Sequence, residues 1–593
     1  MSFTLLPPET IVRIIQYLNP VDIKSTQTVS RYLRQIIAND PHLQYVLELD
    51  KSGYIVPRFI RQDLDYGELI QAIRDHRSRW QRVELGEPKS IEAPDALHAI
   101  CHGKYLSDGV YALCFETITN NGDIRSSLRL YQLPSSNKGT DYKHWIHDNL
   151  GFCVSAFVIQ PELDLMVLLE YSPLHELNSD HNPHRRYRIH LRTATSNEPH
   201  PLAIVPSPLL DIGKIPYLCL EDPNPVGLYG RILFLRFTPN QHHPAFGPVI
   251  ILFDWIAGEE VGRIKLGPYA GCSVTFISEE YLVIPQGYKH NTAPSTDRNQ
   301  AGSLLIFHLP PYTEGPEDRR AKHIATLAFP NLCEHQNELR LRLCGGAFPI
   351  PDTAFWSKQT NQVPKIYDLN RWSHICLYYE AFNRGNAPRA NVQSRWTFEK
   401  DFSPSGLLYM SSQALLDLLG KYVDIRGSNK PVPIPWETWC IYAACQPVMD
   451  LPGACMWGRK SAFLHYDAGI HSSYESHAQL VILDFIPSGR PTKQLTEDEK
   501  LVETLTFTTL GHRSRKDSPK GTISTQQQVT GKFIEPEVAA LNMRYRRTII
   551  DLESEKHQSL CVHGLEMDDE HLVTALELPT DFTGRRFFYV YTL

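Results

Sequence analysis

The first fifty residues carry apolar side chains at helical spacing. One helical face collects Ile11, Ile14, Ile15 and Leu18. The pair Asn19-Pro20 ends this helix and begins the next, because Asn is a favoured N-cap residue and Pro suits the first helical position. Ser30 is placed to cap a third helix, and a fourth short apolar run follows it. The pattern predicts a small all-α domain over residues 1–50.

Strand-like runs replace the helical pattern from about residue 98 onward. Short apolar runs bounded by Gly, Pro, Asn and Asp return many times, such as "GVYALCF", "GRILFLRF" and "AQLVILDF". One unit recurs, in which a strand, an acidic turn and two further apolar strands follow one another. The clearest copy is "CSVTFISEEYLVIP" followed by "AGSLLIFHL". Recurring sheet units with variable loops are typical of a β-propeller.

We therefore expect a large all-β domain over residues 93–593. Its fold is predicted to be an irregular β-propeller of about seven blades. A pair of β-sandwiches is the alternative, but no clear linker divides the strand-rich region. The best helical exception within it is "SSQALLDLLGKYV" at residues 411–423.

Residues 51–92 form a connector that contains one helical segment. Ile70, Ile73 and Trp80 fall on one face of this predicted helix. Its arginines lie at positions 74, 77, 79 and 82. Such a cluster can bind an acidic partner, but a solvated helix face with Trp80 docked on the next domain is the simpler interpretation. A rigid helix at this place would fix the direction in which the large domain points.

A helical domain as small as residues 1–50 cannot bury much apolar surface by itself. No cysteine lies in this range to supply a disulfide or a thiolate metal site. Two arrangements remain open at this point. Another protein completes the apolar face, as in recognition of a helix by a groove, or the helices pack on the rest of the chain.

The stretch "LPPETIVRIIQYLNPVDIKSTQTVSRYLRQIIAND" at residues 6–40 resembles an F-box. The resemblance rests on Leu6-Pro7 with Glu9, Tyr17-Leu18, Asn19-Pro20, Asp22-Ile23, and Val29-Ser30 with Leu33. The order and spacing of these parts favour the F-box over simple packing on the chain. F-box motifs bind the Skp-family adaptor subunit of cullin–RING ubiquitin ligases, so the resemblance implies a Skp-family partner.

The resemblance also implies which residues bind the adaptor. This set comprises Leu6, Pro7, Pro8, Glu9, Ile11, Ile14, Leu18, Pro20, Ile23, Val29, Ser30 and Leu33. The second helix departs from the family pattern, because Lys24, Ser25 and Thr26 stand where further leucines are usual. The lost apolar area, at roughly 25 cal/mol per Å², is expected to weaken adaptor binding without abolishing it.

Composition narrows the choice of partners and compartment. The net charge of −7 gives no sign of a nucleic-acid or anionic-membrane partner, since both favour basic surfaces. The most apolar runs stop far short of the roughly 20 residues that span a bilayer. The 12 cysteines are scattered and form no Cys-x-x-Cys pair, which indicates buried free thiols in a chain without an export signal. We expect a cytoplasmic or nuclear protein.

The sequence offers no motif for catalysis, a cofactor or a metal ion. "HELNSDH" places His175 and His181 six residues apart, whereas the zinc-protease helix needs a spacing of four. The acidic turns "SEE", "PELD" and "MDDE" contain paired carboxylates, but they recur at one place in the strand unit, and solvated turns are the preferred interpretation. No catalytic, cofactor-binding or metal-binding residue is assigned.

The resemblance thus implies a non-catalytic substrate receptor of an SCF-type cullin–RING ubiquitin ligase. The helical domain would bind the Skp-family adaptor and, through it, the cullin and RING subunits. The large domain would present a bound protein substrate, so that the chain contributes proximity and orientation. Two alternatives remain open, namely a Skp-binding scaffold that acts outside ubiquitylation and an enzyme with a propeller active site.

Overall fold

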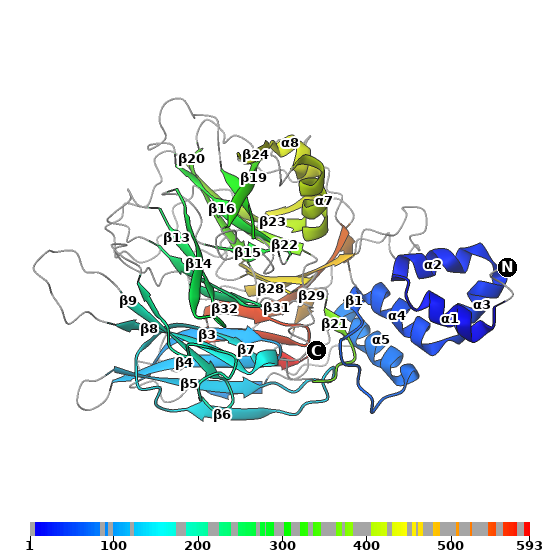
Figure 1. Cartoon of the computed structure of the whole chain (residues 1–593), viewed down its shortest axis with the longest axis horizontal. Helices are drawn as coiled ribbons and strands as arrows, with labels where there is room; N and C mark the ends of the chain where they lie inside the picture. Colours follow the sequence, from blue (N-terminus) through cyan, green and yellow to red (C-terminus); the bar gives the residue numbers. More distant parts are fainter. Residues whose placement is uncertain are drawn as a thin grey trace, which may run out of the picture.

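The computed structural model comprises an N-terminal helical head and a large strand-rich body (Figure 1). It describes residues 6–82, 89–92, 99–118, 124–172, 186–211, 225–238, 247–267, 273–278, 280–289, 302–309, 321–329, 336–344, 363–369, 374–383, 405–423, 430–447, 454–457, 460–466, 478–486, 506–508, 522–524, 544–552, 561–577 and 586–592. Within these ranges no helix is both long and apolar enough to cross a membrane.

Four short helices build the head, and a longer fifth helix leads to the body. They are α1 (Pro8–Ile15), α2 (Pro20–Val29), α3 (Arg31–Asn39), α4 (Pro41–Ser52) and α5 (Tyr66–Arg82). Asn19 accepts a hydrogen bond from the backbone N–H of Asp22 at 2.9 Å, and Ser30 accepts one from Leu33 at 3.2 Å. Both predicted N-caps are therefore confirmed. Gly53 ends α4 in the left-handed region, with φ 74°.

Seven sheets of the described chain form the blades of a β-propeller. Blade 1 consists of β3 (Ala99–Ser107), β4 (Val110–Ile118), β5 (Ile124–Gln132) and β6 (Lys143–His147). Blade 2 consists of β7 (Val154–Gln160), β8 (Leu165–Ser172), β9 (Arg186–Thr193) and β10 (Leu209–Asp211). Blade 3 consists of β11 (Val226–Tyr229), β12 (Ile232–Phe237), β13 (Val249–Asp254) and β14 (Glu259–Lys265).

Additional strands and helices enlarge blades 4 to 6. Blade 4 consists of β15 (Thr275–Phe276), β16 (Tyr281–Gln286), β18 (Ser303–His308), β19 (Lys322–Ala328) and β24 (Val432–Ile434). Blade 5 consists of β17 (Tyr288–Lys289), β20 (Gln336–Cys344), β22 (His374–Asn383), β23 (Ser405–Ser411) and β25 (Ala443–Pro447). Blade 6 consists of β26 (Ala454–Trp457), β27 (Lys460–Tyr466), β28 (Ala478–Ile486), β31 (Arg544–Leu552), β29 (Thr506–Thr508) and β30 (Thr522–Ser524). The helices α7 (Ser412–Tyr422) and α8 (Trp436–Trp439) follow β23 and β24.

Blade 7 closes the ring with strands from the beginning and the end of the described propeller. It consists of β32 (Cys561–Met567), β33 (His571–Glu577), β34 (Arg586–Thr592) and β2 (Lys89–Glu92). β2 pairs antiparallel with β34, so Lys89 lies opposite Val590. Residues 89–92 were expected to belong to the connector, and that boundary is wrong. The strand pairing of blade 7 shows that the propeller begins at Lys89.

The fold class is thus a helical head followed by a seven-bladed β-propeller. The expected helix within residues 411–423 is confirmed as α7. One cluster of buried side chains joins α4 and α5 to blades 1, 2, 3, 6 and 7. A separate cluster lies wholly within the head.

Candidate functional site

The head has a hydrophobic core of its own. Its buried members are Ile11, Ile15, Ile23, Leu33, Ile37, Leu43 and Leu47. Ile11, Ile23 and Leu33 belong to the set that the F-box resemblance implies for adaptor binding. The structure places these three between the helices, where they hold the head together. The head is therefore not sealed beneath the sheets of the propeller.

A second group of apolar side chains on the same helices faces outward. Its members and exposed fractions are Ile14 (41%), Tyr17 (92%), Val21 (65%), Val29 (73%) and Tyr32 (39%). We call these five residues the outer face. Helices α1, α2 and α3 lie at the end of the molecule far from the propeller (Figure 1). Several exposed apolar side chains on so small a domain are typical of a protein-binding surface.

The resemblance identified only part of the outer face. Ile14 and Val29 were in the implied set, whereas Tyr17, Val21 and Tyr32 were missed. The helical period of α2 could have identified Val21. Ile23 is buried and marks the inner side of this helix, whereas Val21 and Val29 lie away from that side and are exposed.

The remaining members of the implied set lie at the surface or at helix starts. Leu6, Leu18, Pro20 and Ser30 are half-buried, and Pro7, Pro8 and Glu9 are exposed. Leu6 and Leu18 pack against the core of the head. Pro8 and Pro20 stand at the first positions of α1 and α2, where a proline costs no backbone hydrogen bond.

The three polar residues that depart from the F-box pattern serve local contacts. Lys24 forms an ion pair with Asp50 and so ties α2 to α4. The hydroxyl of Ser25 donates to the carbonyl of Val21 at 3.0 Å, and that of Thr26 donates to Asp22 at 2.8 Å. These polar groups occupy the surface of α2, and the core of the head is formed without them.

The opposite end of the head is fixed by a buried carboxylate. Glu48 of α4 is 2% exposed and pairs with Arg77 of α5 at 2.8 Å. Arg74 and Lys51 also reach its carboxylate, each at 3.3 Å. Burial alone would raise the pKa of Glu48, but these three cations lower it below its usual value. Two of the arginines that were expected to be solvated therefore bind α5 to α4.

Aromatic side chains connect α5 to the propeller. Trp80 is buried, and its indole N–H donates to the carbonyl of Asp569 at 2.9 Å. The ammonium of buried Lys460 lies 4.3 Å from the centre of the Trp80 ring. The rings of Tyr54 and Tyr367 stack with centroids 4.3 Å apart, and Tyr367 Oη lies 3.0 Å from His76 Nε2. The prediction that Trp80 docks on the next domain is confirmed.

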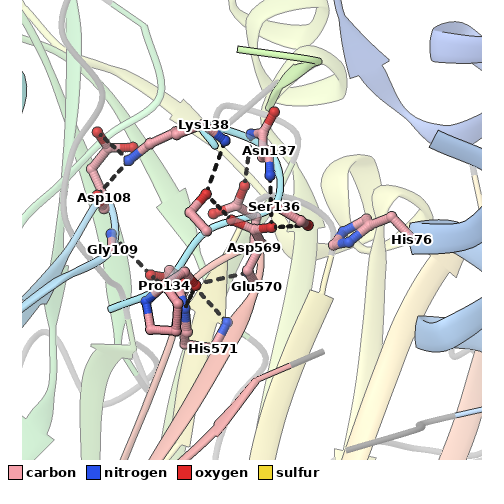
Figure 2. A network of polar contacts seen from close by, with 12 residues as sticks. His76, Asp108, Gly109, Pro134, Ser136, Asn137, Lys138, Asp569, Glu570 and His571 are labelled. Carbon is pink, nitrogen blue, oxygen red and sulfur yellow. Dashed lines mark hydrogen bonds and ion pairs between the residues drawn. The ribbon is translucent and has the colours of Figure 1, made fainter. Parts of the chain in front are cut away.

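The acidic turn between β32 and β33 lies beside Ser136 and Asn137 of blade 1 (Figure 2). Asp568, Glu570 and His571 are 1%, 2% and 1% exposed. The expectation that "MDDE" is a solvated turn is therefore wrong. The Glu570 carboxylate accepts hydrogen bonds from the Ser135 hydroxyl, from Ser136 Oγ at 2.6 Å and from the backbone N–H of Asn137 at 3.0 Å. A loop of blade 1 supplies the hydrogen-bond donors that replace water around the Glu570 carboxylate. The local sequence around Glu570 does not reveal these distant donors.

Asp568 links the acidic turn to the first hairpin of blade 1. Its carboxylate accepts from the backbone N–H of Gly109 at 3.0 Å and lies 2.9 Å from His571 Nδ1. Asp108 and Gly109 form the turn between β3 and β4 with φ angles of 47° and 79°, as an Asp-Gly hairpin requires. The Lys138 ammonium lies 2.8 Å from the Asp108 carboxylate (Figure 2).

An insertion of blade 5, at residues 345–373 between β20 and β22, completes the contact. Its strand β21 (Asp368–Leu369) pairs with β1 (Tyr54–Ile55) of the connector. Asn137 Oδ1 accepts from the backbone N–H groups of Ile366 and Tyr367 at 2.8 and 3.0 Å. Tyr45 of α4 donates its hydroxyl to the Ile366 carbonyl at 2.6 Å. We call the contacts among α4, α5, β1, β21, blade 1 and the acidic turn the joint.

Charges within the joint shift one another's pKa values. Burial alone would lower the pKa of His571, but the Asp568 carboxylate raises it to about 9. Burial together with the charges of Asp568 and Glu570 raises the pKa of Asp569 to about 7. Burial and the charge of Lys460 hold the pKa of His76 well below its usual value. The joint thus combines a cationic His571 with a neutral His76.

The polar groups of the joint hold parts of the chain together and do not form a recognisable reaction centre. Its acidic groups are bonded to backbone N–H groups, hydroxyls, a lysine and a histidine. Among the described residues, no group of three or more His, Cys, Asp and Glu side chains is arranged to hold a metal ion. The geometry therefore supports a structural role, in which the joint fixes the head to the propeller.

Comparison with known proteins assigns the head to a class. Residues 3–45 match the protein family described as F-box-like. The chain therefore joins an F-box-like domain to a seven-bladed propeller, and the F-box-like domain implies binding to a Skp-type adaptor. A comparison with curated proteins gave no match.

Solved structures match this chain only at low similarity. The β-propeller domain of the Trilobed protease from Pyrococcus furiosus is 8% identical, with 84% of this chain and 94% of that chain covered and a TM-score of 0.36. The Pyrococcus horikoshii acylaminoacyl peptidase is also 8% identical, with 82% of this chain and 51% of that chain covered and a TM-score of 0.34. At such scores, the blade assignment for this chain rests on its own strand pairing.

Proposed function

We propose that this chain is the substrate receptor of an SCF-type cullin–RING ubiquitin ligase. The observation that carries the proposal is an F-box-like domain whose core is complete while apolar side chains remain exposed on α1, α2 and α3. In this role the chain performs no chemistry itself. It binds a Skp-type adaptor with its head and a protein substrate with its propeller.

The outer face is the proposed adaptor-binding surface. Ile14, Val29 and the three residues missed by the resemblance supply exposed apolar area, and burial of such area drives association. Ile11, Ile23 and Leu33 support this surface from the core of the head. Pro7, Pro8 and Glu9, which are exposed at the start of α1, remain candidates for direct contact.

The joint supports a receptor that presents its substrate in a defined direction. Ubiquitin transfer between bound proteins depends on proximity and orientation. Trp80 bonds α5 to blade 7 at 2.9 Å. Glu570 and Asn137 connect blade 7, blade 1 and the insertion of blade 5 through hydrogen bonds between 2.6 and 3.1 Å. An adaptor bound to the outer face would therefore take up a fixed position relative to the propeller.

The experiment is capture of the purified chain on a recombinant Skp-type adaptor. The variant Tyr17→Ala/Val29→Ala removes two of the most exposed side chains of the outer face. The matched control is Ile204→Ala, because Ile204 is 75% exposed but lies in the propeller. We expect capture by the wild type and the control and at least a tenfold weaker affinity for the double variant, a difference of about 1.4 kcal/mol. Equal capture of all three proteins would refute the assignment of the outer face.

A second measurement separates the receptor from a scaffold that acts outside ubiquitylation. The adaptor-bound chain is mixed with a cullin and a RING subunit and separated by size. Joint migration of all four subunits supports the receptor. Exclusion of the cullin by the bound chain would favour the scaffold instead.

A further inference from the structure

Two cysteines face each other at the base of the insertion that holds the head. Cys344 is the last residue of β20, and Cys376 lies opposite it on the antiparallel strand β22. Their side chains are hydrogen-bonded to each other. Residues opposite each other in an antiparallel pair have Cα atoms about 4.5–5.5 Å apart, which falls within the range of protein disulfides. Both residues are free cysteines in the structure.

The position of this pair connects it to the joint. A bond between Cys344 and Cys376 would close a loop that contains the whole insertion at residues 345–373. The described part of this insertion binds the head, because β21 pairs with β1 and Tyr45 donates to the Ile366 carbonyl. β21 lies beside β1 at the boundary of head and body, whereas β22 lies within the body (Figure 1). The cysteine pair therefore stands where the insertion leaves its blade.

Additional contacts of the insertion depend on the same segment. The Lys365 ammonium pairs with Glu162 at 2.7 Å, and its backbone N–H donates to the Phe59 carbonyl at 2.8 Å. Arg61 in turn donates its backbone N–H to the Lys365 carbonyl at 3.2 Å. A restraint at the base of the insertion would reduce the number of conformations open to this segment when the joint opens.

We propose that Cys344 and Cys376 form a reversible disulfide that locks the base of the insertion and thereby holds the head on the propeller. The oxidant is a low-molecular-mass disulfide of the glutathione type. The Cys344 thiolate attacks one glutathione sulfur, forms a mixed disulfide and releases one glutathione thiolate. Cys376 then gives up its proton and attacks the Cys344 sulfur, which releases the second glutathione. Two protein thiols are oxidised, one glutathione disulfide is reduced to two thiols, and the two thiol protons pass to the released thiolates.

The surroundings distinguish the roles of the two sulfurs. Cys344 is half-buried and Cys376 is 0% exposed, so a glutathione molecule meets Cys344 first. The hydrogen bond from Cys376, with help from the nearby Arg342 charge, lowers the pKa of Cys344. Burial raises the pKa of Cys376 well above its usual value. The thiolate is the nucleophile in thiol–disulfide exchange, which makes Cys344 the attacking residue and Cys376 the resolving one.

The first test follows the chemistry in the full-length chain. The protein is treated with glutathione disulfide, its remaining thiols are alkylated under denaturing conditions, and its peptides are analysed by mass spectrometry. We expect a Cys344–Cys376 cross-link in the wild type and in the control Cys440→Ser. Cys376→Ala should retain glutathione on Cys344, and Cys344→Ser should carry neither modification. Equal alkylation of both cysteines with and without oxidant would overturn the proposal.

The second test asks whether the bond holds the head. Amide hydrogen exchange is measured in α5 and in residues 363–369, before and after oxidation. We expect exchange to slow at least about tenfold in the oxidised wild type, because disulfides that close loops restrain the open state. A reducing thiol should reverse the change, and Cys344→Ser should not respond. A disulfide that forms without any change in exchange would overturn the locking role.

Discussion

The outer face and the joint lie at opposite ends of the helical head, and they differ in which kinds of side chain they expose and bury. On the outer face, apolar side chains such as Tyr17 and Val29 are 92% and 73% exposed. In the joint, polar and charged groups such as Glu570 and His571 are almost fully buried and hydrogen-bonded. Exposed apolar groups gain free energy when a partner covers them, whereas buried polar groups lose it when their partners leave. The difference indicates that the outer face binds another molecule, whereas the joint stabilises contacts within this chain.

The largest effect should come from removing the aromatic anchor of the joint. We expect Trp80→Ala to lower the free energy of unfolding by about 3–5 kcal/mol, since it deletes a buried indole. The matched control is Trp439→Ala in the propeller, where the indole is also buried and donates to the Ala328 carbonyl at 2.9 Å.

Amide hydrogen exchange distinguishes the loss of stability in Trp80→Ala from that in Trp439→Ala. Trp80→Ala should increase exchange throughout α4 and α5, whereas Trp439→Ala should leave those helices protected. Equal exchange in both variants would mean that the joint does not depend on Trp80.

A smaller loss is expected when the acidic turn loses one carboxylate. Glu570→Ala leaves the Ser136 hydroxyl and the Asn137 N–H without their acceptor, which costs roughly 2–4 kcal/mol. Glu570→Gln keeps the shape and one acceptor oxygen and should cost less. Denaturant unfolding of both variants checks the order. A greater loss in the Gln variant would contradict the hydrogen-bond argument.

The joint should also weaken as pH rises. His571 binds its proton more tightly in the folded protein, with a pKa of about 9 against an ordinary value of 6.5. Its stabilising contribution is fully present below pH 6.5 and is lost as pH rises through 9. The raised pKa of Asp569, about 7, acts in the same direction, with its contribution declining between pH 3.8 and 7.

Unfolding measured across pH 6–9 checks the sign and size of this effect. We expect the free energy of unfolding to fall by roughly 1–3 kcal/mol over this range. His571→Gln should flatten the profile above pH 6.5. A wild-type stability that increases over this range would show that other groups govern the joint.

The smallest effect on stability should come from the outer face. Ile14→Ala should change the free energy of unfolding by less than about 0.5 kcal/mol, as is usual for exposed sites. Its neighbour Ile11 is 0% exposed, and Ile11→Ala should cost about 2–5 kcal/mol. The pair separates binding from folding, because only Ile14→Ala should weaken adaptor binding while the head stays folded. Comparable destabilisation by both changes would erase the distinction between core and outer face.

Local patterns were sufficient for the elements but not for the joint. The helical period and the Asn19 and Ser30 caps identified the head, because caps and periodicity act within a few residues. Recurring strand units indicated the propeller for the same reason. The local patterns of the head did not distinguish buried from exposed residues. Ile11 and Ile14 were therefore both assigned to the adaptor-binding set. That distinction depends on how α1 packs on α3 and on the shared core of the head.

Contacts between distant parts of the chain escaped prediction. Glu570 is bonded to Ser136 and Asn137, which lie more than four hundred positions earlier. Nothing in the local sequence "MDDE" distinguishes this buried turn from a solvated one. The pairing of β2 with β34 was missed in the same way, since each strand reads as an ordinary short run until its partner is known.

The closure of blade 7 has a consequence for how the protein is made. Of the described propeller strands, β2 is synthesised first and β34 last, yet the two must pair to finish the ring. The head can fold around its own core soon after it leaves the ribosome, whereas the Asp569 carbonyl that Trp80 contacts is synthesised 489 positions after Trp80. A prematurely terminated product would keep an F-box-like domain and lack the surface that orients it. The complete joint therefore forms only after blade 7 has been synthesised.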